Sequence, residues 1–271
     1  MLKLLDSQAR AIGRRTISTF PIVESLFRNV RSEYLRTHIH LRTASRNCFR
    51  AAPIDPFAIY WVDPEEINDV ATAIEWPRYE RLGVVLDGDW DEPDISFTET
   101  DIYQSFERHF EDGVPWEDTE FFDRVASSIA RGNTPWGCDS QSALHDRCEQ
   151  LDALYANIEA HGFKTQAQLM ADESVDTAAT NRTTEFERFL YDEVAIDIGR
   201  DGSLLFSDGR NRLAIAKILG VDEIPVVVLL RHEGWQSFRD QIAAHIHTHG
   251  SAPSIANSHP DLASINDELS H

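Results

Sequence analysis

In the last third of the chain, up to residue 240, short apolar runs alternate with turn signals. Residues 193–198 and 203–206 are rich in β-branched and apolar residues and are separated by a glycine-bounded turn, which predicts two strands. Residues 213–220 have helical spacing and end in glycine, and residues 224–230 form an uninterrupted apolar run typical of a buried strand. The pattern predicts the order strand, turn, strand, loop, helix, strand.

The preceding residues divide into further segments. Apolar residues recur at steps of three and four over 22–48, which predicts amphipathic helices, and two prolines at 53 and 56 end this arm. A strand is expected at 57–62 and another at 83–86, whereas 91–162 is mostly helical in pattern and dense in aromatic and acidic residues. We therefore expect a basic helical arm at 1–52, a domain at 53–240 with a helical insertion at about 68–150, and a disordered acidic tail at 241–271.

Charge changes sign along the chain. The formal charge is −21, yet the first 50 residues carry +7 and the remainder −28, and only three of the 25 basic residues are lysines. An acidic surface poor in lysine is typical of a protein kept soluble by concentrated salt, so we expect a high-salt cytosol. Three scattered cysteines indicate a reducing compartment, and the start lacks a secretory pattern, which predicts a cytoplasmic protein.

The basic arm allows three interpretations. Residues 1–50 could dock on an acidic partner, lie on an anionic membrane surface as a peripheral anchor, or pack on the acidic body of their own chain. We favour the last. DNA binding through the arm ranks lowest, because salt weakens contacts that depend on phosphate alone.

The most informative motif joins the second predicted strand to the helix. Gly209 permits a tight, left-handed turn, and the helix that follows begins with free N–H groups and a positive dipole end. Arg210 and Arg212 could grip phosphate oxygens, and Asp208 and Asn211 complete the motif. The alternative is that these arginines pair with neighbouring carboxylates. Two arginines at a helix start oppose the dipole, so an anionic ligand would resolve the conflict.

This motif, followed by residues 213–226, resembles the central motif of the ParB/sulfiredoxin superfamily, in which such a turn holds nucleotide phosphates. Residues 61–67 resemble the first strand and turn of that fold, and residues 154–166, ending at Gln166, resemble the helix and glutamine-bearing turn before its second strand. The resemblance covers about residues 57–232 and is strongest over 194–231. It implies an α/β (α+β) fold with a small mixed sheet and a nucleotide held by Gly209 to Arg212 and Gln166.

This chain departs from the family pattern in two respects, which narrows the set of activities that the resemblance implies. Arg210 stands where sulfiredoxins carry cysteine and where chromosome-partitioning members carry glutamate, and the residues after Arg231 do not have the pattern expected of a helix-turn-helix domain. A third branch, similar to nucleotide-dependent kinases of free serine, keeps the motif. It implies ATP or CTP with Mg²⁺ and transfer of a phosphoryl group to a small hydroxyl compound, with Asp208 and Glu65 as candidate catalytic carboxylates.

Two further hypotheses come from the residues themselves. Asp87, Asp89 and Asp91 surround a turn and could hold Mg²⁺, although a solvated acidic turn is the simpler interpretation. The alternative to an enzyme is a non-catalytic, nucleotide-dependent switch or adaptor that the basic arm recruits to its partner. Binding without turnover would distinguish that switch from a phosphotransferase.

Overall fold

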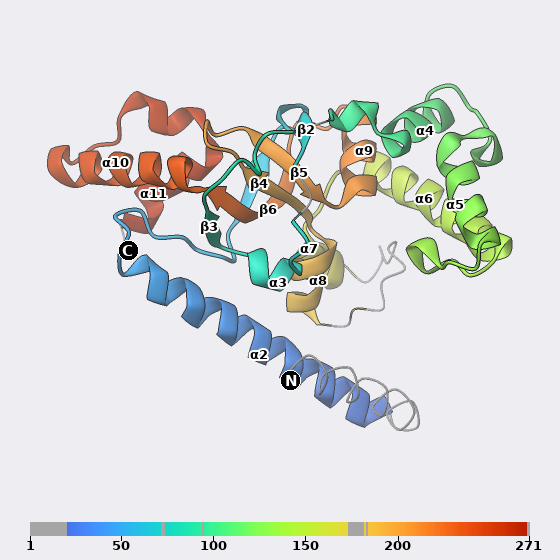
Figure 1. Cartoon of the computed structure of the whole chain (residues 1–271), viewed down its shortest axis with the longest axis horizontal. Coiled ribbons are helices and arrows are strands. Elements are labelled where there is room, and N and C mark those ends of the chain that lie inside the picture. The colour runs from blue at the N-terminus through green and yellow to red at the C-terminus, as the bar shows by residue number, and fades with distance from the viewer. Residues whose placement is uncertain (1–20, 72–73, 94, 173–181, 183, 270–271) are drawn as a thin grey trace.

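The computed structural model describes residues 21–71, 74–93, 95–172, 182 and 184–269. It shows a mixed α/β architecture in which helices pack on both faces and at both ends of a six-stranded sheet (Figure 1). The predicted α/β (α+β) class is therefore confirmed.

The sheet combines parallel and antiparallel pairs. Its order is β1-β6-β4-β5-β2, with β3 also paired to β6. The strands β1 and β6, and β4 and β5, are antiparallel, whereas β6 is parallel to both β4 and β3 and β5 is parallel to β2. The strands are β1 (Ile59–Val62), β2 (Asp69–Val70), β3 (Val84–Leu86), β4 (Val194–Ile198), β5 (Leu204–Asp208) and β6 (Ile224–His232).

Strand β6 is the centre of the sheet. All nine of its residues are buried, which is why its sequence is a continuous apolar run rather than an alternation. It pairs with β4 along one edge and with β1 and β3 in succession along the other. The strands and helix expected over 193–230 are all present at the expected places.

Helices complete two apolar cores, one on each face of the sheet. The larger core joins α4, α5, α6, α9, α10 and α11 to one face, and the smaller joins α2, α3 and α8 to the other. The helices are α2 (Pro21–Asn47), α3 (Arg78–Arg81), α4 (Asp101–Phe110), α5 (Glu120–Ala130), α6 (Gln141–His161), α7 (Gln166–Ala171), α8 (Glu185–Asp192), α9 (Arg210–Ile218), α10 (Glu233–His249) and α11 (Pro260–Leu269).

The predicted insertion is helical only in part. Residues 69–70 and 84–86 form strands of the main sheet, so the helical block begins after them, at the turn before α4. The helices α4, α5 and α6 lie together at one end of the molecule (Figure 1), where α4 and α6 pack on α9. The two-residue strand β2 is too short for a periodicity signal, which explains the misplaced boundary.

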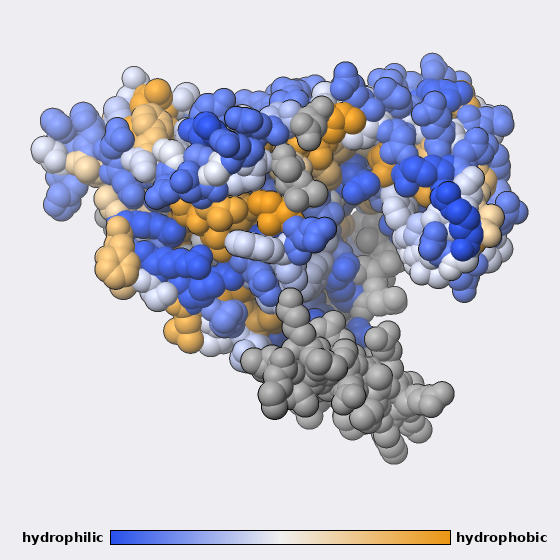
Figure 2. Space-filling view, viewed as in Figure 1, coloured by the Kyte–Doolittle hydropathy of each residue, from blue (hydrophilic) through white to orange (hydrophobic). Residues whose placement is uncertain are grey.

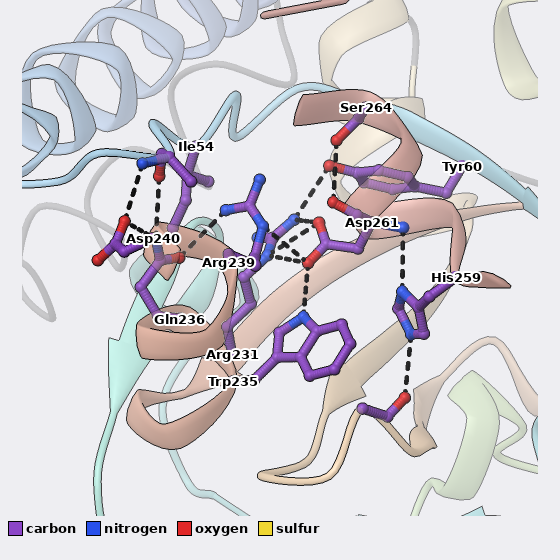
Figure 3. Close-up of polar contacts among 12 residues, drawn as sticks. Ile54, Tyr60, Arg231, Trp235, Gln236, Arg239, Asp240, His259, Asp261 and Ser264 are labelled. Atoms are coloured by element: carbon purple, nitrogen blue, oxygen red, sulfur yellow. Dashed lines mark hydrogen bonds and ion pairs between the residues drawn. The ribbon is translucent and has the colours of Figure 1, made fainter. Parts of the chain in front are cut away.

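The predicted disordered tail is wrong for its described residues, 241–269. Helix α10 continues to His249, and α11 follows with Leu262 and Ile265 buried. Figure 3 shows the cause: Asp261 at the start of α11 accepts hydrogen bonds from Arg231 (2.6 Å to Nη2) and from the indole of Trp235 (2.8 Å). This segment of small and polar residues is ordered because the buried carboxylate of Asp261 is paired with hydrogen-bond donors on β6 and α10.

A second arginine shares that carboxylate. The Nε atom of Arg239 lies 3.2 Å from Asp261 Oδ2, and Tyr60 on β1 accepts from Arg231 Nη2 at 3.0 Å. Burial acts to raise the pKa of Asp261, but the two guanidiniums outweigh it and hold the pKa below its ordinary value. The cluster ties β1, β6, α10 and α11 together.

The described part of the arm is one long helix. Helix α2 spans 27 residues and packs on α3 and α8, so this part contacts its own chain, as we favoured; the predicted segment 1–20 lies outside the described residues. Among the helices of the described ranges, none is both long and apolar enough to cross a lipid bilayer.

Candidate functional site

The turn between β5 and α9 has the geometry that its glycine predicts. Gly209 adopts a left-handed conformation (φ +93°), and a Cβ atom there would lie 2.9 Å from the Cα atom of Val194 on β4. No side chain caps α9, and the amides of Arg212 and Leu213 donate to the carbonyl of Gly209. The amides of Arg210 and Asn211 have no acceptor among the described residues.

Arg212 points into the protein. Its Nη2 atom donates to the carbonyl of Lys164 at 2.6 Å, its Nη1 atom lies 3.3 Å from Glu193 Oε2, and its guanidinium stacks over Phe163 at 4.3 Å. The side chain is 11% exposed. The interpretation in which the arginines pair with carboxylate neighbours therefore holds for Arg212, which positions the turn instead of presenting a cation to solvent.

Glu193 brings Arg212 and Gln166 together. The backbone amide of Gln166, at the start of α7, donates to Glu193 Oε1 at 2.6 Å, and its side-chain Nε2 atom lies 3.4 Å from the carbonyl of Asp192. Glu193 is 1% exposed, and burial raises the pKa of its carboxyl. The Gln166 Oε1 atom is buried and has no hydrogen-bond partner among the described residues. No local sequence signal marks Glu193 as part of this site, because it lies at the start of an apolar run.

Arg78 is a second buried cation at this place. From α3 it donates to the carbonyls of Tyr191 (2.9 Å) and Glu193 (3.0 Å) and contacts Asp208 Oδ2 at 3.3 Å. It fixes the junction of α8 and β4 against the end of β5. No local sequence signal marks Arg78, because its partners lie more than 110 residues away along the chain.

Arg210 differs from these two arginines. It is exposed, and its guanidinium has no hydrogen bond or ion pair with any other described residue. Asp208 beside it is half-exposed and accepts from the Gly209 amide at 2.8 Å. The Oδ1 atom of Asn211 is buried without a described partner. The turn thus presents one cation, one carboxylate and two unused amides to its surroundings.

Glu65 lies elsewhere. Its Oε2 atom is 3.6 Å from Lys217 Nζ, in the last turn of α9. At 1.5 Å per residue, Lys217 is about 10 Å along the helix from Arg210. The structure therefore does not bring Glu65 together with Asp208, and the predicted pair of catalytic carboxylates is not assembled.

The acidic turn after β3 holds an arginine. Asp91 accepts from the backbone amide (2.7 Å) and the guanidinium (2.6 Å) of Arg200, and Asp89 lies 3.0 Å from the same guanidinium. The hydrogen bonds from Arg200 lower the pKa of Asp91 to about 2. Asp87 is instead 3.8 Å from His232. Within the described ranges, no three His, Cys, Asp or Glu side chains are grouped to hold a metal. The geometry does not support the predicted Mg²⁺ site.

A cavity of about 420 Å³ adjoins Glu193 on the opposite side from the larger core. Its walls come from α2, α7, α8 and the segment entering β1. Three aromatic rings, Phe57, Phe186 and Phe189, contact one another in its lining. Its volume is within the range of roughly 300–1,000 Å³ that is common for small-ligand sites.

No family model, curated protein sequence or solved structure matches this chain. The site must be interpreted from its own geometry.

Proposed function

We propose that this chain binds the phosphate group of a small molecule at the turn of Asp208 to Asn211, and that a nucleoside triphosphate, ATP or CTP, is the ligand. The observation that carries the proposal is the contrast among the arginines of this region. Arg78 and Arg212 are each paired with a carboxylate and backbone carbonyls of the protein, whereas Arg210 stands exposed at the uncapped start of α9.

The components of an anion site are close together at this turn. The unused amides of residues 210 and 211 and the positive end of the α9 dipole favour a negative charge, and the Arg210 guanidinium can bind two phosphate oxygens at once. Gly209 lets the turn pack against β4 without a side chain in between. Gln166 Oε1, buried and unpartnered among the described residues, offers an acceptor for a ligand hydroxyl or amine near Glu193.

The order of the helices and strands supports a ParB/sulfiredoxin-like fold, which is part of the proposal. A mixed sheet in which β5 leads through a glycine turn into α9, followed by the buried strand β6, is what a ParB/sulfiredoxin-like domain requires. The resemblance implies phosphate binding at the same turn. We therefore also propose that this chain belongs to the ParB/sulfiredoxin superfamily.

Phosphoryl transfer to a small hydroxyl compound is the activity we propose for this site. It needs a carboxylate beside the phosphate to orient the attacking hydroxyl or Mg²⁺. Asp208 is in the turn itself and is half-exposed, so it is the residue for this role. If the chain binds nucleotide without turnover, it is instead the switch or adaptor that forms the alternative.

Calorimetric titration of the full chain with ATP and with CTP, in high salt with Mg²⁺, tests the proposal. We expect saturable binding that Arg210→Ala weakens at least about tenfold, since a charge-assisted contact is worth roughly 1.5–3 kcal/mol. Arg131→Ala, which removes an exposed arginine at the end of α5, is the matched control and should bind like the wild type.

Two results would refute nucleotide binding at this turn. One is the absence of binding by both nucleotides, and the other is equal affinity in Arg210→Ala and the wild type. The variant Asp208→Asn distinguishes nucleotide binding from phosphoryl transfer. It should abolish release of phosphate or its transfer to an acceptor, while nucleotide affinity is retained.

A further inference from the structure

The cavity of about 420 Å³ beside Glu193 has no part in the nucleotide site proposed above. It lies where α2 meets α8, and in Figure 1 α8 is placed between α2 and the sheet. Ser32 on α2 and Thr184 at the start of α8 both line it, and their hydroxyl oxygens are 3.1 Å apart. This direct contact ties two walls of the cavity together, so a ligand does not have to bring them into place.

Three phenyl rings line this cavity. Phe57, Phe186 and Phe189 are each partly buried, and their ring centroids are 5.7 to 6.1 Å apart. The face of an aromatic ring carries partial negative charge and attracts a cation. The chain itself uses this property, because the guanidinium carbon of Arg36 lies 6.0 Å from the centroid of Phe57. The rings therefore offer a cation a favourable surface as well as an apolar one.

The charges that face the cavity are not balanced. Glu33 on α2 and Glu185 on α8 are exposed, and neither carboxylate has a hydrogen bond or ion pair with another described residue. The charge of Glu193 is matched by Arg212, 3.3 Å away. Arg36 is the basic residue of the described lining. Two unpaired carboxylates against one guanidinium leave one negative charge over, which a monovalent cation would neutralise.

Carboxylates alone would not mark a site on this protein. The chain has 46 Asp and Glu residues, and Figure 2 shows a face on which hydrophilic residues predominate. The cavity differs from such a surface because its unpaired carboxylates share one lining with three phenyl rings. The carboxylates favour positive charge, and the rings favour both positive charge and an apolar group.

We propose that this cavity binds a small organic cation, an amine that carries an aromatic or short apolar group. Glu33 and Glu185 supply the negative charge for the ammonium group, and the phenyl rings pack on the rest of the molecule. An anion would meet two carboxylates with Arg36 as its single basic contact in the described lining, and a neutral apolar molecule would leave both carboxylates unused. The volume of the cavity is sufficient for one ring and a short chain.

Calorimetric titration of the full chain without nucleotide tests the proposal. The probes are phenethylamine, phenethyl alcohol and hydrocinnamate, which share a phenyl ring and a short chain and differ in charge. We expect saturable binding of phenethylamine with a dissociation constant near or below about 1 mM, which is reasonable for a ligand of this size. Phenethyl alcohol and hydrocinnamate should each bind at least about tenfold more weakly, because one lacks the positive charge and the other is an anion.

Three variants assign the binding to this cavity. The double variant Glu33→Gln/Glu185→Gln should weaken phenethylamine binding at least about tenfold and leave phenethyl alcohol binding unchanged, because it removes only charge. Arg36→Gln should strengthen phenethylamine binding about threefold or more, since it removes a competing cation from Phe57. Glu149→Gln, at an exposed carboxylate of α6, is the control and should bind like the wild type. Circular dichroism should be the same for all of them.

Three outcomes would overturn the proposal. The first is no saturable binding of phenethylamine, and the second is binding of phenethyl alcohol or hydrocinnamate with equal or higher affinity. The third is phenethylamine binding that the double variant Glu33→Gln/Glu185→Gln leaves intact, because the amine would then bind elsewhere. No nucleotide is present in these titrations, so their failure would leave the proposed nucleotide site untouched, and failure of that site would not affect this test.

Discussion

Asp197 in β4 offers a test of how burial and charge oppose each other in this sheet. The residue is 1% exposed, and its Oδ1 atom accepts from the amide of Leu230 at 3.0 Å, where the register between β4 and β6 shifts. Arg81 Nη1 is 3.8 Å from Oδ2, which has no hydrogen-bond partner among the described residues. Burial raises the pKa of Asp197 to about 6, although Arg81 acts in the opposite direction.

That pKa sets both the size and the sign of the effect on stability. A carboxyl whose pKa rises from 3.8 in the unfolded chain to about 6 costs about 3 kcal/mol of folding free energy at any pH above 6. Between those two values the folded chain keeps a proton that the unfolded chain has lost. This residue therefore makes stability fall as pH rises through the window, and below it the cost disappears.

Asp197→Asn removes the charge and keeps an oxygen for the Leu230 amide. We expect the variant to be more stable than the wild type by about 1–3 kcal/mol at pH 8, with the difference vanishing near about pH 4. Urea denaturation followed by tryptophan fluorescence at constant high salt measures both free energies. Asp222→Asn, at an exposed carboxylate, is the control and should stay within about 0.5 kcal/mol.

A variant that is less stable than the wild type at pH 8, by the same amount at every pH, would refute this reasoning. It would mean that the attraction between Asp197 and Arg81 exceeds the cost of burying the carboxylate.

Three more outcomes follow from the packing. Asp261→Asn should destabilise the fold by about 3–5 kcal/mol in chemical denaturation, because two buried guanidiniums lose the carboxylate they share. Gly209→Ala should cost about 1–3 kcal/mol in thermal unfolding through its left-handed backbone and its contact with β4, and more than Gly220→Ala, which meets open space. In a Cys48→Ser variant no thiol should react at pH 8 until the chain unfolds, since Cys138 and Cys148 are buried and burial raises the pKa of Cys148 to about 12.

The elements that the sequence predicted well are those with local causes. Strand β6 is a continuous apolar run because both faces of the strand are covered, and α6 ends at Gly162, where the predicted helical pattern stops. The turn at Gly209 follows from a conformation that glycine alone adopts easily. Such signals act between neighbours in the chain, so they can be interpreted without the fold.

The roles of the charged residues in the candidate site depend on partners that are distant along the chain but close in the folded structure. Arg210 and Arg212 look alike in the sequence, but only Arg212 meets Glu193 and the carbonyl of Lys164, because α7 and α8 bring those groups to it. The carboxylate of Asp91, which the sequence suggested as either a solvated group or a Mg²⁺ ligand, instead meets Arg200, 109 residues away. The composition contains many possible partners for each charged residue, and nothing local in the sequence indicates which of them it contacts.

Order in residues 241–269 has the same explanation. Their small and polar residues give little local preference, so the sequence by itself predicted disorder, whereas Asp261 and Ile265 become ordered by contacts with β6 and α10. Local periodicity and turn chemistry thus determined the strands, the helix after the motif and the glycine turn. Only the tertiary structure decided which charges are paired and which remain open to a ligand, because burial and the distance between ionic groups are properties of the folded chain.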